Sequence, residues 1–336
     1  MGVCEVTMPA NLTLQYLQAE ERFRNARTRE ERIAALEDMI RELPKHKGTE
    51  KMYADLKTRL SKLRKEDESE HGRRSSGPMI EREGIGQVIV IGPPNSGKSA
   101  LVAALTNAPV EVTDYPFATR KAIPGMMRYE DVRIQLVDTP SLSADFKDPG
   151  LMPLVRAADA AALVVDLGAP DCLDQPVMLI AELSGANIEP VKGTVEETPK
   201  HGSPRRIPAM FVGTRADHQD APTAVELLRE VIGERLPFVS VSVNDAASLA
   251  AFARACFDMF GVVRAYSKQP GKDPDMGDPF ILPKGSSVLD LAEKIHRDLR
   301  ERFAYARVWG GGRYQGQRVA RDYVVQDKDI VEIHTA

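Results

Sequence analysis

Cysteines are scarce in this 336-residue sequence, and neither sign of charge dominates it. The three cysteines, Cys4, Cys172 and Cys256, lie far apart and form no Cys-x-x-Cys pair. That spacing argues against a disulfide scaffold or a zinc ribbon and favours a reducing, cytoplasmic compartment. The formal net charge of −4 predicts no polyanion partner from the field of the whole protein. Any nucleic-acid contact therefore has to come from a local basic patch.

Long apolar segments are also missing. No apolar run in the sequence approaches the roughly 20 residues that a membrane-spanning helix needs, so we expect no membrane association. The first residues lack the basic region followed by an apolar region that marks a secretory signal, and we expect no such signal.

The sequence does contain a phosphate-binding motif, Gly-Pro-Pro-Asn-Ser-Gly-Lys-Ser, at residues 92–99. An apolar strand pattern at 88–91 precedes this motif and a helix-forming stretch at 100–105 follows it. This context distinguishes a phosphate cradle from a chance glycine turn. Backbone N–H groups of such a loop, together with the N-terminus of the helix, point at an anion. The motif therefore predicts a bound nucleoside triphosphate but not its base.

Two positions near this loop are candidate Mg²⁺ ligands. The Ser99 hydroxyl would bind the ion directly, and Asp138, at the end of the strand pattern 132–137, would bind it through water. The alternative role of Asp138 is that of an ordinary turn or cap residue. Lys98 would reach the β- and γ-phosphates, which makes it a candidate catalytic residue. The residues expected to contact the nucleotide in the loop are Gly92, Pro93, Pro94, Asn95, Ser96, Gly97, Lys98, Ser99 and Ala100.

Residues 114–119, Asp-Tyr-Pro-Phe-Ala-Thr, lie between the phosphate motif and Asp138. A mobile segment at this place would bring the Thr119 hydroxyl onto Mg²⁺ and the γ-phosphate, so Thr119 is a candidate metal ligand and catalytic residue. An ordinary proline-rich loop fits the same composition. The order of the motifs along the chain favours the switch.

A base-recognition motif, Thr-Arg-Ala-Asp, occupies residues 214–217 after a strand pattern. The Asp217 carboxylate can accept hydrogen bonds from both N1–H and N2–H₂ of guanine, a pair of donors that adenine lacks. The other residues assigned to the base site are Thr214, Arg215, Ser242 and Val243, the last two through their backbone N–H groups. The expected ligand is therefore GTP or GDP.

The distribution of strand and helix patterns predicts an α/β protein of three domains. Residues 11–67 show the spacing of amphipathic helices in a helical hairpin domain, and 68–85 have the composition of a linker. In 86–268 apolar strands alternate with helices, which predicts a mostly parallel sheet with helices on both faces. An irregular insertion at about 168–207 interrupts this alternation, and 278–336 form a small α+β domain.

Individual elements can also be predicted. Strands are expected at 87–91, 132–137, 161–166, 208–213 and 237–242 in the central domain, and at 280–282, 306–309, 323–325 and 330–333 in the last domain. A helix over 288–303 is expected to begin at Ser287, with Asp290 completing the cap.

The chain resembles an Obg-type GTPase of the DRG (developmentally regulated GTP-binding protein) branch. Tyr-Pro-Phe-Ala-Thr at 115–119 is similar to the family's Y-P-F-T-T switch, and 47–64 are similar to its N-terminal helical hairpin. The segments that resemble the family's C-terminal TGS domain are 295–299, 305–310, 317–319 and 329–334. The resemblance implies a P-loop GTPase domain, a ubiquitin-like β-grasp fold for 278–336, and contacts with RNA, ribosomes or proteins. Residues 168–207 are too short for the extra αβ domain of eukaryotic members, which implies a reduced, prokaryotic relative.

Several positions depart from the family pattern. Ser141 stands where the Asp-x-x-Gly motif has glycine, and Thr214 and Arg215 replace the usual Asn and Lys of the guanine motif. Leu142 falls where many GTPases place the glutamine that orients water, so slow intrinsic hydrolysis is expected. Several GTPases with a hydrophobic residue there recruit K⁺ through an Asn of the phosphate loop, and Asn95 stands in that place. Asn95 is thus a candidate K⁺ ligand and catalytic residue, or else a residue that shapes the loop.

A basic stretch offers a candidate RNA contact. Residues 41–65 carry nine Lys and Arg against three acidic residues, which would neutralise RNA phosphates or simply form a solvated helix face. Two functions stay open. One is a Mg²⁺-dependent GTPase that engages the ribosome or ribosomal RNA in translation or ribosome assembly. The other is a low-turnover GTP/GDP sensor that docks a protein accessory factor through its TGS and helical domains.

Overall fold

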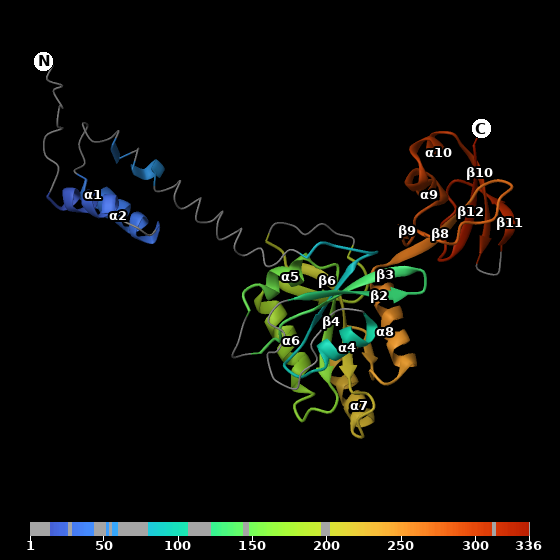
Figure 1. Cartoon of the computed structure of the whole chain (residues 1–336), viewed down its shortest axis with the longest axis horizontal. Coiled ribbons are helices and arrows are strands. Elements are labelled where there is room, and N and C mark those ends of the chain that lie inside the picture. The colour runs from blue at the N-terminus through green and yellow to red at the C-terminus, as the bar shows by residue number, and fades with distance from the viewer. Residues whose placement is uncertain are drawn as a thin grey trace, which may run out of the picture. The chain divides into compact units, whose positions relative to one another are not determined.

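The structure is a computed structural model that describes residues 14–25, 29–43, 52–53, 56–59, 80–106, 122–143, 148–195, 202–310 and 314–335. The chain divides into two compact units, Met1–Ser76 and Gly77–Ala336. In the first unit, α1 (Leu14–Asn25) and α2 (Arg29–Glu42) pack against each other and bury Tyr16, Ala19 and Leu36 (Figure 1). The described part of this unit is a helix pair around a small apolar core.

The second unit begins with a mostly parallel sheet whose strand order is β2-β3-β1-β4-β6-β5, with β7 paired to β6. Its strands are β1 (Gln87–Ile91), β2 (Ile123–Tyr129), β3 (Val132–Asp138), β4 (Ala160–Asp166), β5 (Ile188–Val191), β6 (Arg205–Thr214) and β7 (Phe238–Ser240). Only the β2–β3 pairing is antiparallel. The carboxyl ends of β1, β3, β4 and β6 therefore meet at one edge, which is where such sheets bind ligands.

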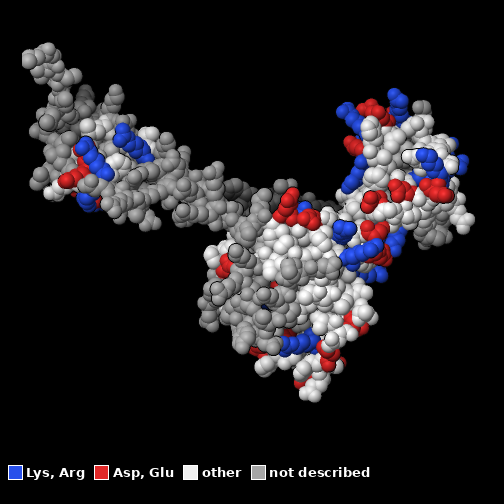
Figure 2. Space-filling model, in the orientation of Figure 1, with Lys and Arg blue, Asp and Glu red and all other residues white. Residues whose placement is uncertain are grey.

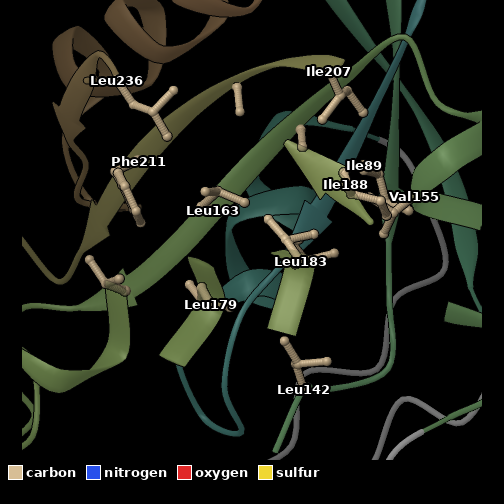
Figure 3. Packing of buried hydrophobic residues seen from close by; sticks show 14 of the residues in the cluster. Ile89, Leu142, Val155, Leu163, Leu179, Leu183, Ile188, Ile207, Phe211 and Leu236 are labelled. Carbon is tan, nitrogen blue, oxygen red and sulfur yellow. The ribbon is translucent and has the colours of Figure 1, made fainter. Parts of the chain in front are cut away.

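Helices cover both faces of this sheet. They are α4 (Lys98–Leu105), α5 (Leu151–Ala157), α6 (Asp174–Gly185), α7 (Ala221–Ile232) and α8 (Ala246–Met259). Side chains of α5, α6 and α7 share one core with Leu163 of β4, and those of α4 and α8 share the other core with Val164. Figure 3 shows Leu163 between Phe211 of β6 and Leu183 of α6. Because both faces are covered, the central strands β1 and β4 are buried along their whole length and almost entirely apolar, as the sequence pattern predicted.

The expected α/β fold with a mostly parallel sheet is confirmed, but three details of the central domain differ from the sequence-based prediction. The region predicted as an irregular insertion contains α6 and β5. The prolines of this region suggested irregular backbone. However, Pro176 lies in the first turn of α6 and Pro190 lies on the edge strand β5, and proline is tolerated at both kinds of position. Strand β2 was not predicted. Ile85, assigned to the linker, donates its backbone N–H to Arg133 O at 2.9 Å, so pairing with the domain begins earlier than predicted.

A second sheet, with strand order β11-β10-β12-β8-β9, ends the chain. Its elements are β8 (Val262–Lys268), β9 (Phe280–Pro283), α9 (Val288–Ile295), α10 (Arg297–Glu301), β10 (Phe303–Gly310), β11 (Tyr314–Val319) and β12 (Asp329–Thr335). Helix α9 packs Val288 and Leu291 against Ala306 and Val308 of β10 on one face of this sheet. The opposite face of β8 carries Arg264, whose side chain reaches the β2–β3 turn.

The last domain also differs in places from its prediction. Strand β8 pairs in parallel with β12 and antiparallel with β9, so residues 262–268 belong to this sheet and not to the GTPase domain. The expected helix 288–303 is divided at His296, whose backbone is extended, and a strand starts at Phe303. Residues 323–325 form no strand, since Val324 makes only an isolated bridge to Ser287. The capping box of Ser287 with Asp290 is confirmed.

No helix among the described residues combines the length and the apolar composition that crossing a bilayer requires.

Candidate nucleotide-binding site

The phosphate loop connects β1 to α4 through two backbone positions that need glycine. A Cβ on Gly92 would lie 2.5 Å from Val164 O, so the loop passes too close to β4 for any side chain. Gly97 has φ 80° and ψ 11°, the left-handed conformation that glycine adopts without strain, and it is the N-cap of α4. This path leaves the helix N-terminus open to an anion, as the motif predicts.

Lys98 is the buried cation of this loop, with a relative exposure of only 4%. Its Nζ donates hydrogen bonds to Pro93 O at 2.7 Å and to Ser141 Oγ at 3.2 Å. Burial lowers the pKa of Lys98 to about 8, although the nearby Asp138 carboxylate opposes that shift. A buried ammonium group beside the helix N-terminus provides strong attraction for a phosphate.

The two candidate Mg²⁺ ligands lie side by side. Ser99 donates its hydroxyl to Asp138 Oδ2 at 2.7 Å, and Asp138 is fully buried at the end of β3. Hydroxyl and carboxylate oxygens are the donors that Mg²⁺ prefers, so this pair fits the ion that a GTPase domain employs. Thr119, the third predicted ligand, lies outside the described residues.

The segment after Asp138 is fixed to the phosphate loop. Thr139 donates its hydroxyl to Val90 O at 2.8 Å, and Leu142 donates its backbone N–H to Gly92 O at 3.0 Å. The Leu142 side chain is 2% exposed and packs in the core formed with α5 and α6 (Figure 3). Leu142 therefore lies in the core in this structure, where its side chain does not reach the phosphate site. The hydroxyl of the preceding residue, Ser141, faces the phosphate loop, where it accepts the hydrogen bond from Lys98.

The base-recognition motif is tied to the phosphate loop by two side chains. Thr214 donates its hydroxyl to Ser96 O at 2.7 Å. Arg215 donates to Asp166 Oδ2 at 2.7 Å and to Asn95 O at 3.3 Å. The side chain of Asp166 is 7% exposed at the end of β4, so the guanidinium has a largely buried anchor. The arginine and threonine at these positions thus hold the loop and the motif together.

Asp217 is exposed at the same edge of the sheet. Its Oδ2 accepts a hydrogen bond from Asn244 Nδ2 at 2.9 Å, and this bond, followed by bonds from its own backbone and from Ser242, lowers the pKa of Asp217. Ser242 is buried and Val243 is 44% exposed in the loop after β7. The carboxylate is therefore ionised and held in place, as guanine recognition requires.

Comparison with known proteins identifies the same two domains. The family model described as "50S ribosome-binding GTPase" matches residues 87–201, and the one described as "TGS domain" matches 263–335. An uncharacterized GTP-binding protein of Methanocaldococcus jannaschii is 27% identical over 362 residues, covering 90% of this chain and 92% of that protein. Developmentally-regulated GTP-binding protein 1 of Xenopus laevis is 28% identical, covering 90% and 98%. Ribosome-interacting GTPase 1 of Saccharomyces cerevisiae is 25% identical, with the same coverage.

Over 90% of its length the chain is similar to the DRG family of GTP-binding proteins. It carries the GTPase and TGS domains of that family in the expected order, and the resemblance inferred from the motifs is confirmed. The match to the TGS domain begins within β8, in agreement with the pairing of that strand in the second sheet.

Two polar residues of this site escaped the sequence analysis. Asp166 anchors Arg215, and Asn244 orients Asp217. The sequence does contain a signal for Asp166, because this residue ends an apolar strand pattern in the same way as Asp138. Asn244 directly follows the predicted pair Ser242 and Val243 but has no motif of its own. Asn95 has φ 57° and is exposed, which leaves both of its predicted roles open.

Proposed function

We propose that this protein hydrolyses GTP to GDP and phosphate as a Mg²⁺-dependent molecular switch that engages the ribosome. The observation that carries the proposal is the meeting of Lys98, the Ser99–Asp138 pair and Asp217 along one edge of the sheet. These groups supply a cation that binds the phosphates, candidate ligands for the metal ion and a hydrogen-bond acceptor for guanine, which are the three elements that a GTPase site needs.

Each group has a defined task in the proposed reaction. Lys98 stabilises the charge that develops on the transferred phosphoryl group, and Asp217 selects guanine. Ser99 and Asp138 would hold Mg²⁺, which neutralises phosphate charge when bound. Because Leu142 lies in the core and has no polar group, the chain provides no glutamine at that position to orient the attacking water. Slow intrinsic turnover follows, and K⁺ bound through Asn95 would supply the missing positive charge.

Ribosome engagement is supported by the charge of the first unit and by the relatives. Residues 41–65 have six more basic than acidic residues, nine against three, and phosphate contacts depend on such patches. One relative is named Ribosome-interacting GTPase 1, and one matching family model is described as a ribosome-binding GTPase. The proposed partner is therefore the ribosome or ribosomal RNA, with a role in translation or ribosome assembly.

The rival function is a GTP/GDP sensor that binds tightly, turns over little and docks a protein through its TGS and helical domains. Ser141 and Leu142 at the switch motif are the observations that favour it. Single-turnover hydrolysis of GTP in K⁺ buffer, with and without ribosomes, separates the two. We expect hydrolysis that ribosomes accelerate, and no hydrolysis in Lys98→Ala. Tight GTP binding with no hydrolysis in either condition would select the sensor.

The ribosome contact is tested separately by co-sedimentation. The full chain is centrifuged with ribosomes in the presence of GDP or a non-hydrolysable GTP analogue. We expect more protein in the ribosome pellet with the analogue, and less at high salt because phosphate contacts weaken with ionic strength. Equal and negligible pelleting in both states would refute the proposed partner.

A further inference from the structure

Ser141 makes a contact that the glycine usual at this position cannot make. Its Oγ lies 3.2 Å from Lys98 Nζ and accepts a hydrogen bond from it. The ammonium has three N–H donors, and Pro93 O, at 2.7 Å, accepts another of them. The serine hydroxyl therefore occupies part of the space around Lys98 in which a phosphate oxygen would bind.

Neighbouring contacts fix Ser141 in this place. Pro140 is buried before it, and Leu142 after it donates its N–H to Gly92 O while its side chain lies in the core. The segment cannot swing freely, so the hydroxyl stays near Lys98 unless these contacts break. This arrangement also gives the buried ammonium group a second acceptor beside Pro93 O, which lowers the cost of its burial.

The contact lies on the γ-phosphate side of the site. Ser141 follows Asp138 by three residues on the same segment, and Asp138 is paired with Ser99 where Mg²⁺ and the β- and γ-oxygens would lie. Pro93 O and Ser141 Oγ accept two of the three N–H donors of Lys98, and a β-phosphate oxygen would accept the third. A γ-phosphate oxygen would then compete with the hydroxyl for its donor, whereas GDP has no γ-oxygen to compete with it. The Ser141–Lys98 hydrogen bond thus favours the diphosphate-bound and nucleotide-free forms over the triphosphate-bound form.

We propose that Ser141 is a positioning residue that favours binding of GDP over GTP. Its hydroxyl accepts the Lys98 hydrogen bond that a γ-phosphate oxygen would otherwise accept. The inference rests on the proposed function, because it assumes that GTP and GDP bind at this loop. It assigns to Ser141 a role in nucleotide discrimination and implies that a factor stabilising the GTP-bound state has to overcome this bond.

The test is the ratio of the affinities of the full-length chain for GDP and for a non-hydrolysable GTP analogue, measured by competition in Mg²⁺ buffer. In Ser141→Ala, which lacks the hydroxyl but keeps Cβ, the analogue should gain about three- to tenfold relative to GDP. Ser141→Thr keeps a hydroxyl and should retain the wild-type ratio. Ser184→Ala makes the same chemical change at an exposed position of α6 and should leave the ratio unchanged.

An unchanged ratio in Ser141→Ala, including an equal loss of both affinities, would overturn the inference. A fall in the relative affinity for the analogue would also overturn it, because the hydroxyl would then assist the γ-phosphate. If the wild-type chain binds neither nucleotide, the proposed function fails and the inference fails with it. Intact binding with an unchanged ratio refutes the inference alone.

Discussion

Arg264 and Asp131 form a short ion pair that joins the two sheets of the second unit, with 2.6 Å between Arg264 Nη1 and Asp131 Oδ1. Arg264 lies on β8 of the TGS sheet, and Asp131 lies in the turn between β2 and β3. The guanidinium also pairs with Asp327 at 2.7 Å, and its side chain is only 2% exposed. Figure 2 shows basic and acidic side chains gathered where these two sheets meet. The hairpin that leads to Asp138 is thus fixed to the TGS sheet by a buried charge.

Replacing this arginine should destabilise the TGS sheet strongly. Arg264→Met leaves the partner carboxylates without their cation. Because Asp131 and Asp327 are themselves 20% and 37% exposed, water solvates them in part, and we expect a cost of about 1.5–3 kcal/mol. The measurement is urea unfolding followed by the fluorescence of Trp309, the one tryptophan of the chain. Arg254→Ala is the control, because Arg254 is 75% exposed and its pair with Asp258 spans 3.9 Å, and it should change stability by less than about 1 kcal/mol. Equal effects of the two substitutions would contradict the role of the cluster.

Acid should weaken the same cluster. Burial opposes ionisation of Asp131 and Asp327, but hydrogen bonds from Tyr266 and Arg264 to Asp131, and from Arg264 to Asp327, outweigh it and lower both pKa values. A carboxyl group with a depressed pKa stabilises the fold above its unfolded pKa of about 4, and this stabilisation is lost as the pH falls through the lower folded value. The urea midpoint should therefore be steady down to about pH 5 and fall below about pH 4. Arg264→Met should show a smaller fall, and an identical acid profile would refute this account.

Guanine selection should depend on Asp217 and, more weakly, on Asn244. Asp217→Asn removes the negative charge and replaces one of the two acceptor oxygens by an NH₂ donor, so the preference for GTP over ATP should fall by about ten- to a hundredfold. Asn244→Ala keeps the carboxylate but removes the hydrogen bond at 2.9 Å that orients it, and should cost about fivefold or less. Competition binding with both nucleotides measures the ratio. A preference that survives Asp217→Asn would remove the guanine assignment.

The phosphate loop should not tolerate a side chain at its first glycine. In Gly92→Ala the added Cβ would meet Val164 O at 2.5 Å, a backbone atom that moves only with β4. Nucleotide affinity should fall by about five- to a hundredfold, since overpacking costs of about 1–3 kcal/mol are typical. Gly185→Ala, with nothing within 4 Å of the added Cβ, is the matched control and should bind GDP normally. Wild-type affinity in Gly92→Ala would show that the loop adopts another path.

Hydrolysis should depend on the monovalent cation. With no polar side chain at Leu142, we expect turnover in K⁺ to exceed that in Na⁺ by at least about tenfold, as positive charge near the transferred phosphoryl group stabilises the transition state. Asn95→Ala should abolish the difference while GDP affinity is retained. Equal turnover of the wild-type chain in the two salts would leave Asn95 as a loop-shaping residue.

Much of the site could be predicted because its parts are local in the sequence. Residues 92–99 specify a loop by their glycines and a cation by Lys98, and the next apolar strand ends at Asp138. The partners of Arg215 and Asp217 were not predictable in the same way. Asp166 and Thr214 are paired residues on the neighbouring strands β4 and β6, and no motif states which strands lie side by side. The same reason explains why residues 262–268 were included in the predicted GTPase domain, although β8 pairs with β12 and β9.

The sequence by itself determined the phosphate loop, the parallel α/β domain and the resemblance to the DRG proteins, because glycine geometry, apolar runs and motif order are properties of short segments. Tertiary structure alone decided what Ser141, Leu142 and Arg264 contact. Ser141 meets Lys98 because the segment after β3 is tied to the loop after β1, and Leu142 enters the core for the same reason. Arg264 finds its carboxylates on segments more than 60 residues away on either side. Contacts of this kind depend on how strands pair across the whole fold, which no local pattern records.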